Sequence, residues 1–121
     1  MKKILAAITV AATLISSGAS AFDAEHVKQL IETGNCAGCD FIRGNLSRAN
    51  MKGADLSGAS LKGANLRASD MTEVNLNDSD LTGADLSGAD LTDADLTFSI
   101  MNGAILCNTT MPNGEVIYSG C

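Results

Sequence analysis

The chain has 121 residues, of which 45% are hydrophobic, and a formal net charge of −6. Its length accommodates one small domain, and its acidity disfavours nucleic acids and anionic membrane surfaces as partners because both carry negative charge. The chain contains four cysteines and a single histidine.

Residues 1–21 have the organisation of a secretory signal peptide. Two lysines follow the first Met, residues 4–15 are apolar, and the small residues at 19–21 form an A-x-A cleavage site. The apolar stretch is shorter than the roughly 20 residues that a membrane-spanning helix needs. We therefore expect export to the periplasm or the medium, cleavage after Ala21, and no membrane insertion of the remaining chain. Without the two lysines the charge of that chain becomes −8, two units below the −6 of the whole.

Residues 22–38 are predicted to form an N-terminal capping helix and a linker. Asp23 has the side-chain type that caps helix N-termini, and Gly34 stands where a left-handed residue ends a helix. The predicted role of this helix is to cover the first coil of the repeat region, because an open end of a repeat structure exposes core and backbone. His26, the only histidine, is predicted to be a surface residue and neither a ligand nor a catalyst.

A repeat of five residues follows the linker. Every fifth residue is large and apolar, the residue two positions earlier is small and usually Ala, and Asp or Asn usually stands between them. The large apolar positions are Phe41, Leu46, Met51, Leu56, Leu61, Leu66, Met71, Leu76, Leu81, Leu86, Leu91, Leu96, Met101, Leu106 and Met111.

A period of five fits neither regular element. Five steps along a helix rotate a side chain by about 140°, and an odd period on a strand alternates between its two faces. The large residues can share one core only if the chain changes direction once per repeat. Gly, Ser and Thr between the repeats supply such turns, so the sequence predicts a β-solenoid.

The stretches ANMKGADLSGASLKGANL at 49–66 and GADLSGADLTDADL at 83–96 closely resemble the pentapeptide-repeat proteins, whose consensus is A-(D/N)-L-x-x. The resemblance covers residues 39–111. It implies an all-β solenoid, a right-handed quadrilateral β-helix with four pentapeptides per coil and a short N-terminal capping α-helix. Residues 112–121 break the repeat and resemble the C-terminal caps of exported family members.

The four cysteines are predicted to form two disulfides. Three pairings are conceivable, but in the solenoid Cys36 and Cys39 lie at one end and Cys107 and Cys121 at the other, roughly 16 Å apart by coil count. A disulfide requires Cα atoms within about 7 Å, so the predicted pairs are Cys36–Cys39 and Cys107–Cys121. The same separation disfavours one zinc site with four Cys ligands.

No catalytic, cofactor or metal site is predicted. Acidic side chains lie outward on a convex rod, whereas catalytic acids need a pocket that shifts their pKa values. Weak Ca²⁺ binding by stacked carboxylates is an alternative to their role in turns. These outward acidic residues include Asp55, Asp80, Asp85, Asp90 and Asp95.

Three apolar residues near the C-terminal end form a candidate interface. Ile100 and Ile105 stand where other repeats have Asp or Asn, and Phe98 takes a corner position that is usually small or polar. Residues 112–118 are expected to fold over them; the alternative is contact with a protein partner or a second copy. Family members dimerise through apolar C-terminal ends, so the resemblance implies a monomer or such a homodimer.

The predicted function is that of a non-catalytic protein-interaction or scaffold module of the cell envelope. One alternative is the family's mimicry of DNA toward a topoisomerase, which requires a long dimeric rod in the cytoplasm, whereas the sequence predicts a short exported one. The other alternative is an exported thiol-redox protein that uses the C-x-x-C pair Cys36 and Cys39.

Overall fold

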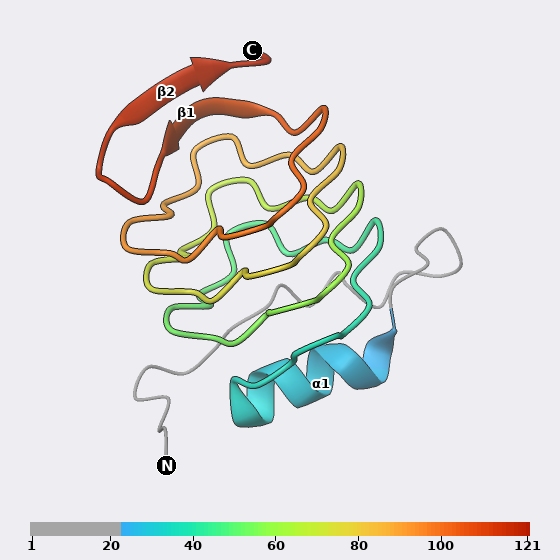
Figure 1. The fold of residues 1–121 in the computed structure, drawn as a ribbon. Helices are drawn as coiled ribbons and strands as arrows, with labels where there is room; N and C mark the ends of the chain where they lie inside the picture. The colour runs from blue at the N-terminus through green and yellow to red at the C-terminus, as the bar shows by residue number, and fades with distance from the viewer. Residues whose placement is uncertain (1–22) are drawn as a thin grey trace.

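The computed structural model describes residues 23–121, so the predicted signal peptide lies outside the described residues. The described chain contains the helix α1 (Ala24–Thr33), a stack of coils, and the antiparallel strands β1 (Leu106–Thr110) and β2 (Val116–Ser119). In Figure 1, α1 crosses one end of the stack, and β2 lies beside β1 at the other end.

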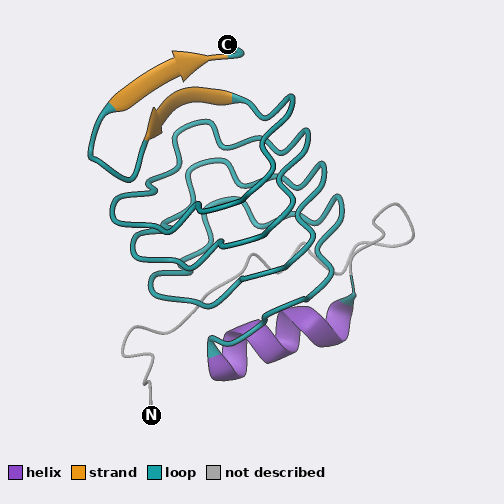
Figure 2. Cartoon of the chain, viewed as in Figure 1, coloured by secondary structure: helices purple, strands orange, loops and turns teal. Residues whose placement is uncertain are grey.

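The coils are four-sided. Parallel bridges join residues 20 positions apart, from Asn35 with Asp55 to Asp90 with Thr110. Twenty residues are four repeats, so each repeat forms one side of a coil. Between residues 35 and 105 each side is so short that only the Asp or Asn position makes a bridge, and Figure 2 draws these coils without strand arrows.

Each repeat ends in a β-turn that begins at its large apolar residue. The N–H of Ala59, for example, donates to the carbonyl oxygen of Leu56 at 3.1 Å. The third turn residue has a positive φ throughout the repeats, as in type II turns, which explains Gly58 with φ 67°. Other residue types also occupy this position, among them Phe98 with φ 60°.

The outward Asp and Asn side chains stabilise the same turns. The carboxylate of Asp80 accepts a hydrogen bond from the backbone N–H of Thr82 at 3.0 Å and another from its hydroxyl at 2.6 Å. Equivalent pairs recur along the rod, for example Asp90 with Thr92. The preference for Asp or Asn before the large residue and Ser or Thr after it therefore comes from local turn bonding.

Because of these hydrogen bonds, we predict that the folded protein loses stability in acid. The Thr82 hydroxyl, and then its backbone N–H, hold the pKa of Asp80 below its ordinary value of 3.8, and Thr97 does the same to Asp95. A lowered folded-state pKa contributes stability that is fully present above the unfolded-state pKa and is lost as the pH falls through the folded-state value. We expect the free energy of unfolding to decline below pH 3.8. Denaturant titrations at a series of pH values measure this decline.

Two matched variants test the origin of the acid sensitivity. Thr82→Val removes one hydrogen bond to a carboxylate, so its stability deficit should shrink as the pH falls and Asp80 is protonated. Ser47→Ala removes the corresponding bond to Asn45, which is 2.7 Å long, and an amide does not titrate in this range. Its deficit should stay constant, and parallel pH curves for both variants would contradict the assignment.

The core is a column of the large repeat residues. From Phe41 to Leu91 these side chains are fully buried, with the small residue of each repeat packed beside them. Cys36 is also fully buried and occupies the same repeat position five residues before Phe41. The first coil thus begins at Asn35, four residues before the predicted boundary at 39, because a Cys in the large position hides the repeat from a search for Leu.

The helix α1 closes the N-terminal end. Asp23 caps it by accepting a hydrogen bond from the N–H of Glu25 at 2.9 Å, and Gly34 ends it in the left-handed conformation. Val27 and Leu30 are buried in the same cluster as the coil residues. Figure 1 shows α1 lying flat across this end of the stack.

His26 is not the simple surface residue that the sequence predicts. Its Nδ1 accepts a hydrogen bond from the N–H of Asp40 at 2.8 Å, and its ring meets the ring of Phe41 edge-on at 6.5 Å. The ring is therefore part of the attachment of α1 to the first coil. Whether His26 faces the first coil depends on how α1 is rotated about its own axis. The sequence of a ten-residue helix does not determine that rotation.

Candidate functional site

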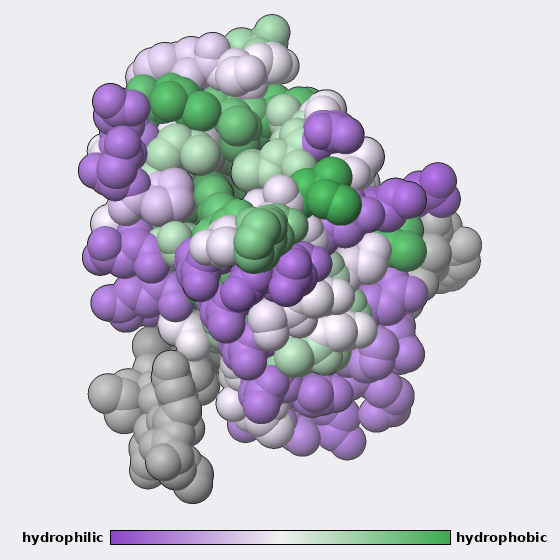
Figure 3. Space-filling model, in the orientation of Figure 1, coloured by the Kyte–Doolittle hydropathy of each residue, from purple (hydrophilic) through white to green (hydrophobic). Residues whose placement is uncertain are grey.

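The two ends of the solenoid are covered to different extents. The large repeat residues of the last coil, Leu96, Met101, Leu106 and Met111, are only partly buried, whereas those beneath them are fully buried. We call residues 94–111 the terminal coil. Figure 3 shows apolar side chains gathered around this end, above coils whose surface is largely hydrophilic.

The predicted interface residues lie on this end. The exposed fraction of Phe98 is 79% and that of Ile100 is 47%, while Ile105 is half-buried. The expectation that residues 112–118 fold over all three is therefore wrong for Phe98 and Ile100. The cause is that β2 pairs with β1 along one side of the terminal coil.

The hairpin adds apolar surface to the same end. Tyr118 is 70% exposed and Val116 is 46% exposed, both on β2. Gly120 lies against Ile105, since a Cβ added to Gly120 would stand 3.4 Å from the Cα of Ile105. The C-terminal segment therefore packs closely against Ile105.

Phe98 is also strained in its backbone. Its φ of 60° is a conformation that costs a residue with a Cβ roughly 1–2 kcal/mol, and its exposed ring recovers little of this by burial. We expect Phe98→Gly to raise the free energy of unfolding by about 0.5–1 kcal/mol, after allowing for the larger unfolded-state entropy of Gly. Denaturant unfolding measures the gain.

The reverse substitution is the control. Gly83 occupies the same position within its repeat, three repeats before Phe98, with φ 68°, and a Cβ added there meets no atom within 4 Å. Gly83→Phe should therefore lower stability by a similar amount through backbone strain alone. A destabilised Phe98→Gly variant would show instead that the aromatic ring packs in the folded protein.

A groove of about 670 Å³ runs across several coils on the side of the rod. Ala68 and Gly88 lie in its middle, where their small side chains leave the space. Arg48 stands at one end, and Asn108 and Cys107 stand at the other. The remaining lining residues are Ser47, Asn65, Arg67 and Ser87.

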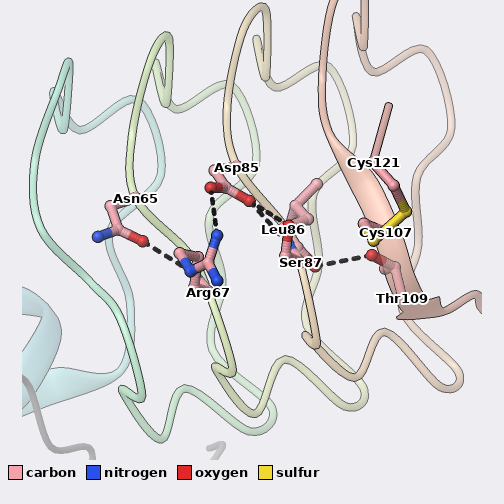
Figure 4. Close-up of polar contacts among 8 residues, drawn as sticks. All are labelled: Asn65, Arg67, Asp85, Leu86, Ser87, Cys107, Thr109 and Cys121. Carbon is pink, nitrogen blue, oxygen red and sulfur yellow. Dashed lines mark hydrogen bonds and ion pairs between the residues drawn. A yellow bond between two sulfur atoms is a disulfide. The ribbon is translucent and has the colours of Figure 1, made fainter. Parts of the chain in front are cut away.

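Polar contacts between neighbouring coils shape this groove. Figure 4 shows the Arg67 guanidinium directed at Asp85 of the next coil, with a nitrogen–oxygen distance of 3.1 Å. Burial raises the pKa of Asp85, but hydrogen bonds from Ser87 and the charge of Arg67 outweigh this and lower its pKa overall. Asp85 balances Arg67, so of the two guanidinium groups that line the groove, Arg48 is the one with no carboxylate partner among residues 23–121, and it can attract a polar or anionic group.

The groove was not predicted from the sequence. Its corner residues Arg48, Ala68, Gly88 and Asn108 are 20 positions apart, which is one coil. At a spacing of 20 residues, and not of five, the sequence shows a column in which the small side chains of Ala68 and Gly88 lie between the larger ones of Arg48 and Asn108.

The two disulfides occupy different environments. Cys36–Cys39 is buried, with exposed fractions of 0% and 3%, and lies inside the first coil. Cys107–Cys121 ties the end of the chain to the terminal coil, and Cys121 is exposed. No free cysteine is present between residues 23 and 121. A buried Cys36 does not have the exposure that the thiol-redox alternative requires.

Residues 23–121 contain neither a metal-binding cluster nor a membrane-spanning helix. Among them no group of three or more His, Cys, Asp or Glu side chains is arranged to hold a metal ion. Within residues 23–121 there is no helix of the length and hydrophobicity needed to cross a bilayer.

Comparisons with known proteins find a matching family model and several similar solved structures. The family model described as pentapeptide repeats matches residues 35–73 and 69–108, with eight copies. Among solved structures, the pentapeptide repeat protein alr5209 from Nostoc PCC 7120 is 32% identical over 73% of this chain and 78% of its own, with a TM-score of 0.45.

Two further solved structures are similar at lower identity. HetL from Nostoc sp. strain PCC 7120, described as involved in heterocyst differentiation regulation, is 22% identical over 69% of this chain and 64% of its own, with a TM-score of 0.25. AT2G44920 from the Arabidopsis thaliana thylakoid lumen is 26% identical over 69% of this chain and 65% of its own, with a TM-score of 0.23. The comparison with curated proteins gives no match.

Proposed function

Because the chain belongs to the pentapeptide repeat family and has its right-handed quadrilateral β-helix fold, we propose that it is a non-catalytic interaction or scaffold module of the cell envelope. In this proposal the terminal coil and β2 form the contact surface for another protein. The predicted signal peptide supports the envelope location.

The observation that carries this proposal is the difference between the two ends. A helix seals the N-terminal end with buried Val27 and Leu30, whereas the C-terminal end exposes Phe98, Ile100 and Tyr118. Exposed apolar residues that gather at one end of a protein are characteristic of interaction sites. Phe98 adds to this argument because it is retained in a strained conformation without being buried.

Site-specific photo-crosslinking in the native envelope tests the proposal. A photoreactive phenylalanine analogue replaces Phe98, and in a control protein the same analogue replaces Ile31, which is 43% exposed on α1. A single defined adduct from position 98, absent from position 31 and identified by mass spectrometry, supports the interaction surface. Equal adducts from both positions, or none from position 98, would argue for a protein without a partner at this end.

A further inference from the structure

The terminal coil has an open backbone edge. In the coil below, N–H groups that point toward the C-terminal end donate to carbonyl oxygens of the next coil at 2.7–2.9 Å. These pairs are Leu76 with Asp95, Asp78 with Thr97, Leu81 with Ile100 and Gly83 with Asn102. The equivalent N–H groups of the terminal coil belong to Leu96, Phe98, Met101 and Gly103. None of them has an acceptor within residues 23–121.

The chain itself shows that such an edge accepts a strand. On another side of the terminal coil, β2 pairs antiparallel with β1, with Leu106 opposite Ser119 and Thr110 opposite Val116. On that side Asn108 has a left-handed backbone conformation, with φ 59°. It lies where the pairing register of β1 and β2 shifts, between Cys107 and Thr109. A corner residue with positive φ is therefore compatible with strand pairing when it is bulged out of the ladder.

Residues 96–100 offer the same arrangement, and within residues 23–121 no strand pairs with their open edge. Phe98, with φ 60°, holds the repeat position that Asn108 holds in β1. A strand in the same register would lie opposite Leu96 and Ile100, and it would cover the half-buried Leu96 side chain. Its outward side chains would lie next to the exposed Phe98 and Ile100, which favours apolar residues in the strand.

The charge around this edge favours one kind of binding segment over another. No Lys or Arg follows Arg67, whereas acidic residues are frequent in the second half of the chain. Asp78, Asp93 and Asp95 lie in the repeats that border the edge. Two copies joined through this edge would bring these like charges together, whereas a basic segment would be attracted by them.

We propose that residues 96–103 bind an extended segment of a partner protein as an added antiparallel strand, one with apolar residues flanked by Lys or Arg. The inference rests on the proposed function and specifies its partner. Main-chain hydrogen bonds to the open N–H groups would provide affinity, and contacts with Phe98 and Ile100 would provide selectivity.

A synthetic peptide provides a direct probe. The peptide Lys-Lys-Val-Ile-Tyr-Ser-Lys-Lys carries the β2 sequence between lysines, and amide hydrogen exchange of the oxidised protein is followed by NMR. At saturation, the amides of Leu96, Phe98, Met101 and Gly103 should exchange at least about ten-fold more slowly. The amide of Leu81, which is already bonded, serves as the internal reference.

Control peptides and variants separate strand pairing from other binding. A peptide N-methylated along the strand cannot pair and should give no protection, and glutamate flanks in place of lysine should weaken binding. Ile100→Asn restores the residue type of the other repeats, so the protein should fold while binding the peptide more weakly. Phe98→Gly should weaken binding while raising stability.

Several results would overturn the inference. Equal binding of the N-methylated peptide, or peptide binding without slower exchange at residues 96–103, would exclude an added strand. Slower exchange without peptide that grows with protein concentration would identify a second copy as the occupant. Protection confined to β1 would mean that the peptide replaces β2. In each case an adduct from position 98 in the crosslinking experiment would still preserve the proposed function, so the two failures are distinguishable.

Discussion

Replacing Leu76 with alanine is expected to lower the free energy of unfolding by about 2–5 kcal/mol. Leu76 is fully buried in the middle of the solenoid, and Leu56 and Leu96 hold the same position in the coils on either side. Backbone hydrogen bonds fix the spacing of these coils, for example from Leu76 to Asp95 at 2.8 Å. The coils cannot close on the cavity, so the loss should include a cavity contribution as well as lost hydrophobic burial.

Leu96→Ala is the matched control for this prediction. Leu96 belongs to the same column but is only partly buried in the terminal coil. Its loss should be clearly smaller, because water already reaches this side chain and no enclosed cavity forms. Denaturant unfolding followed by circular dichroism measures both variants. Equal losses at 76 and 96, or an unchanged midpoint for Leu76→Ala, would contradict the inward column.

Removing the Cys107–Cys121 disulfide by two Cys→Ser substitutions is expected to cost up to about 3 kcal/mol. The disulfide spans 14 residues and closes the loop that contains β2. Most side chains of β2 are exposed, so the strand is held mainly by its hydrogen bonds to β1 and by this bond. Amides of Val116–Ser119 should therefore lose their protection against exchange well before the coils unfold. A variant with native exchange in β2 would show that packing alone holds the hairpin.

The order of reduction in the native protein provides a control. Cys121 is exposed, whereas Cys36 and Cys39 are buried in the first coil. Mild reduction followed by alkylation should therefore label Cys107 and Cys121 first. Earlier labelling of Cys36 would contradict the structural role of the buried pair and would revive the thiol-redox alternative.

The sequence determined the repeat architecture because the information is local. Each five-residue unit carries its own inward pair, its own turn and its own outward Asp or Asn, as Ala54, Asp55 and Leu56 show. Since consecutive units are alike, the fold follows from one unit repeated. The disulfide pairs followed from the same regularity, because the number of coils set the distance between cysteines.

Only the tertiary structure decided which residues form surfaces. The groove unites Arg48, Arg67 and Cys107 because stacking brings together residues about 20 or 40 positions apart, and a five-residue pattern does not display that spacing. The contacts of His26 depend on how α1 rotates against the first coil. The exposure of Phe98 depends on which side of the terminal coil β2 covers. Repeats determine the interior, where every unit has the same neighbours, whereas the ends and corners differ because their neighbours differ.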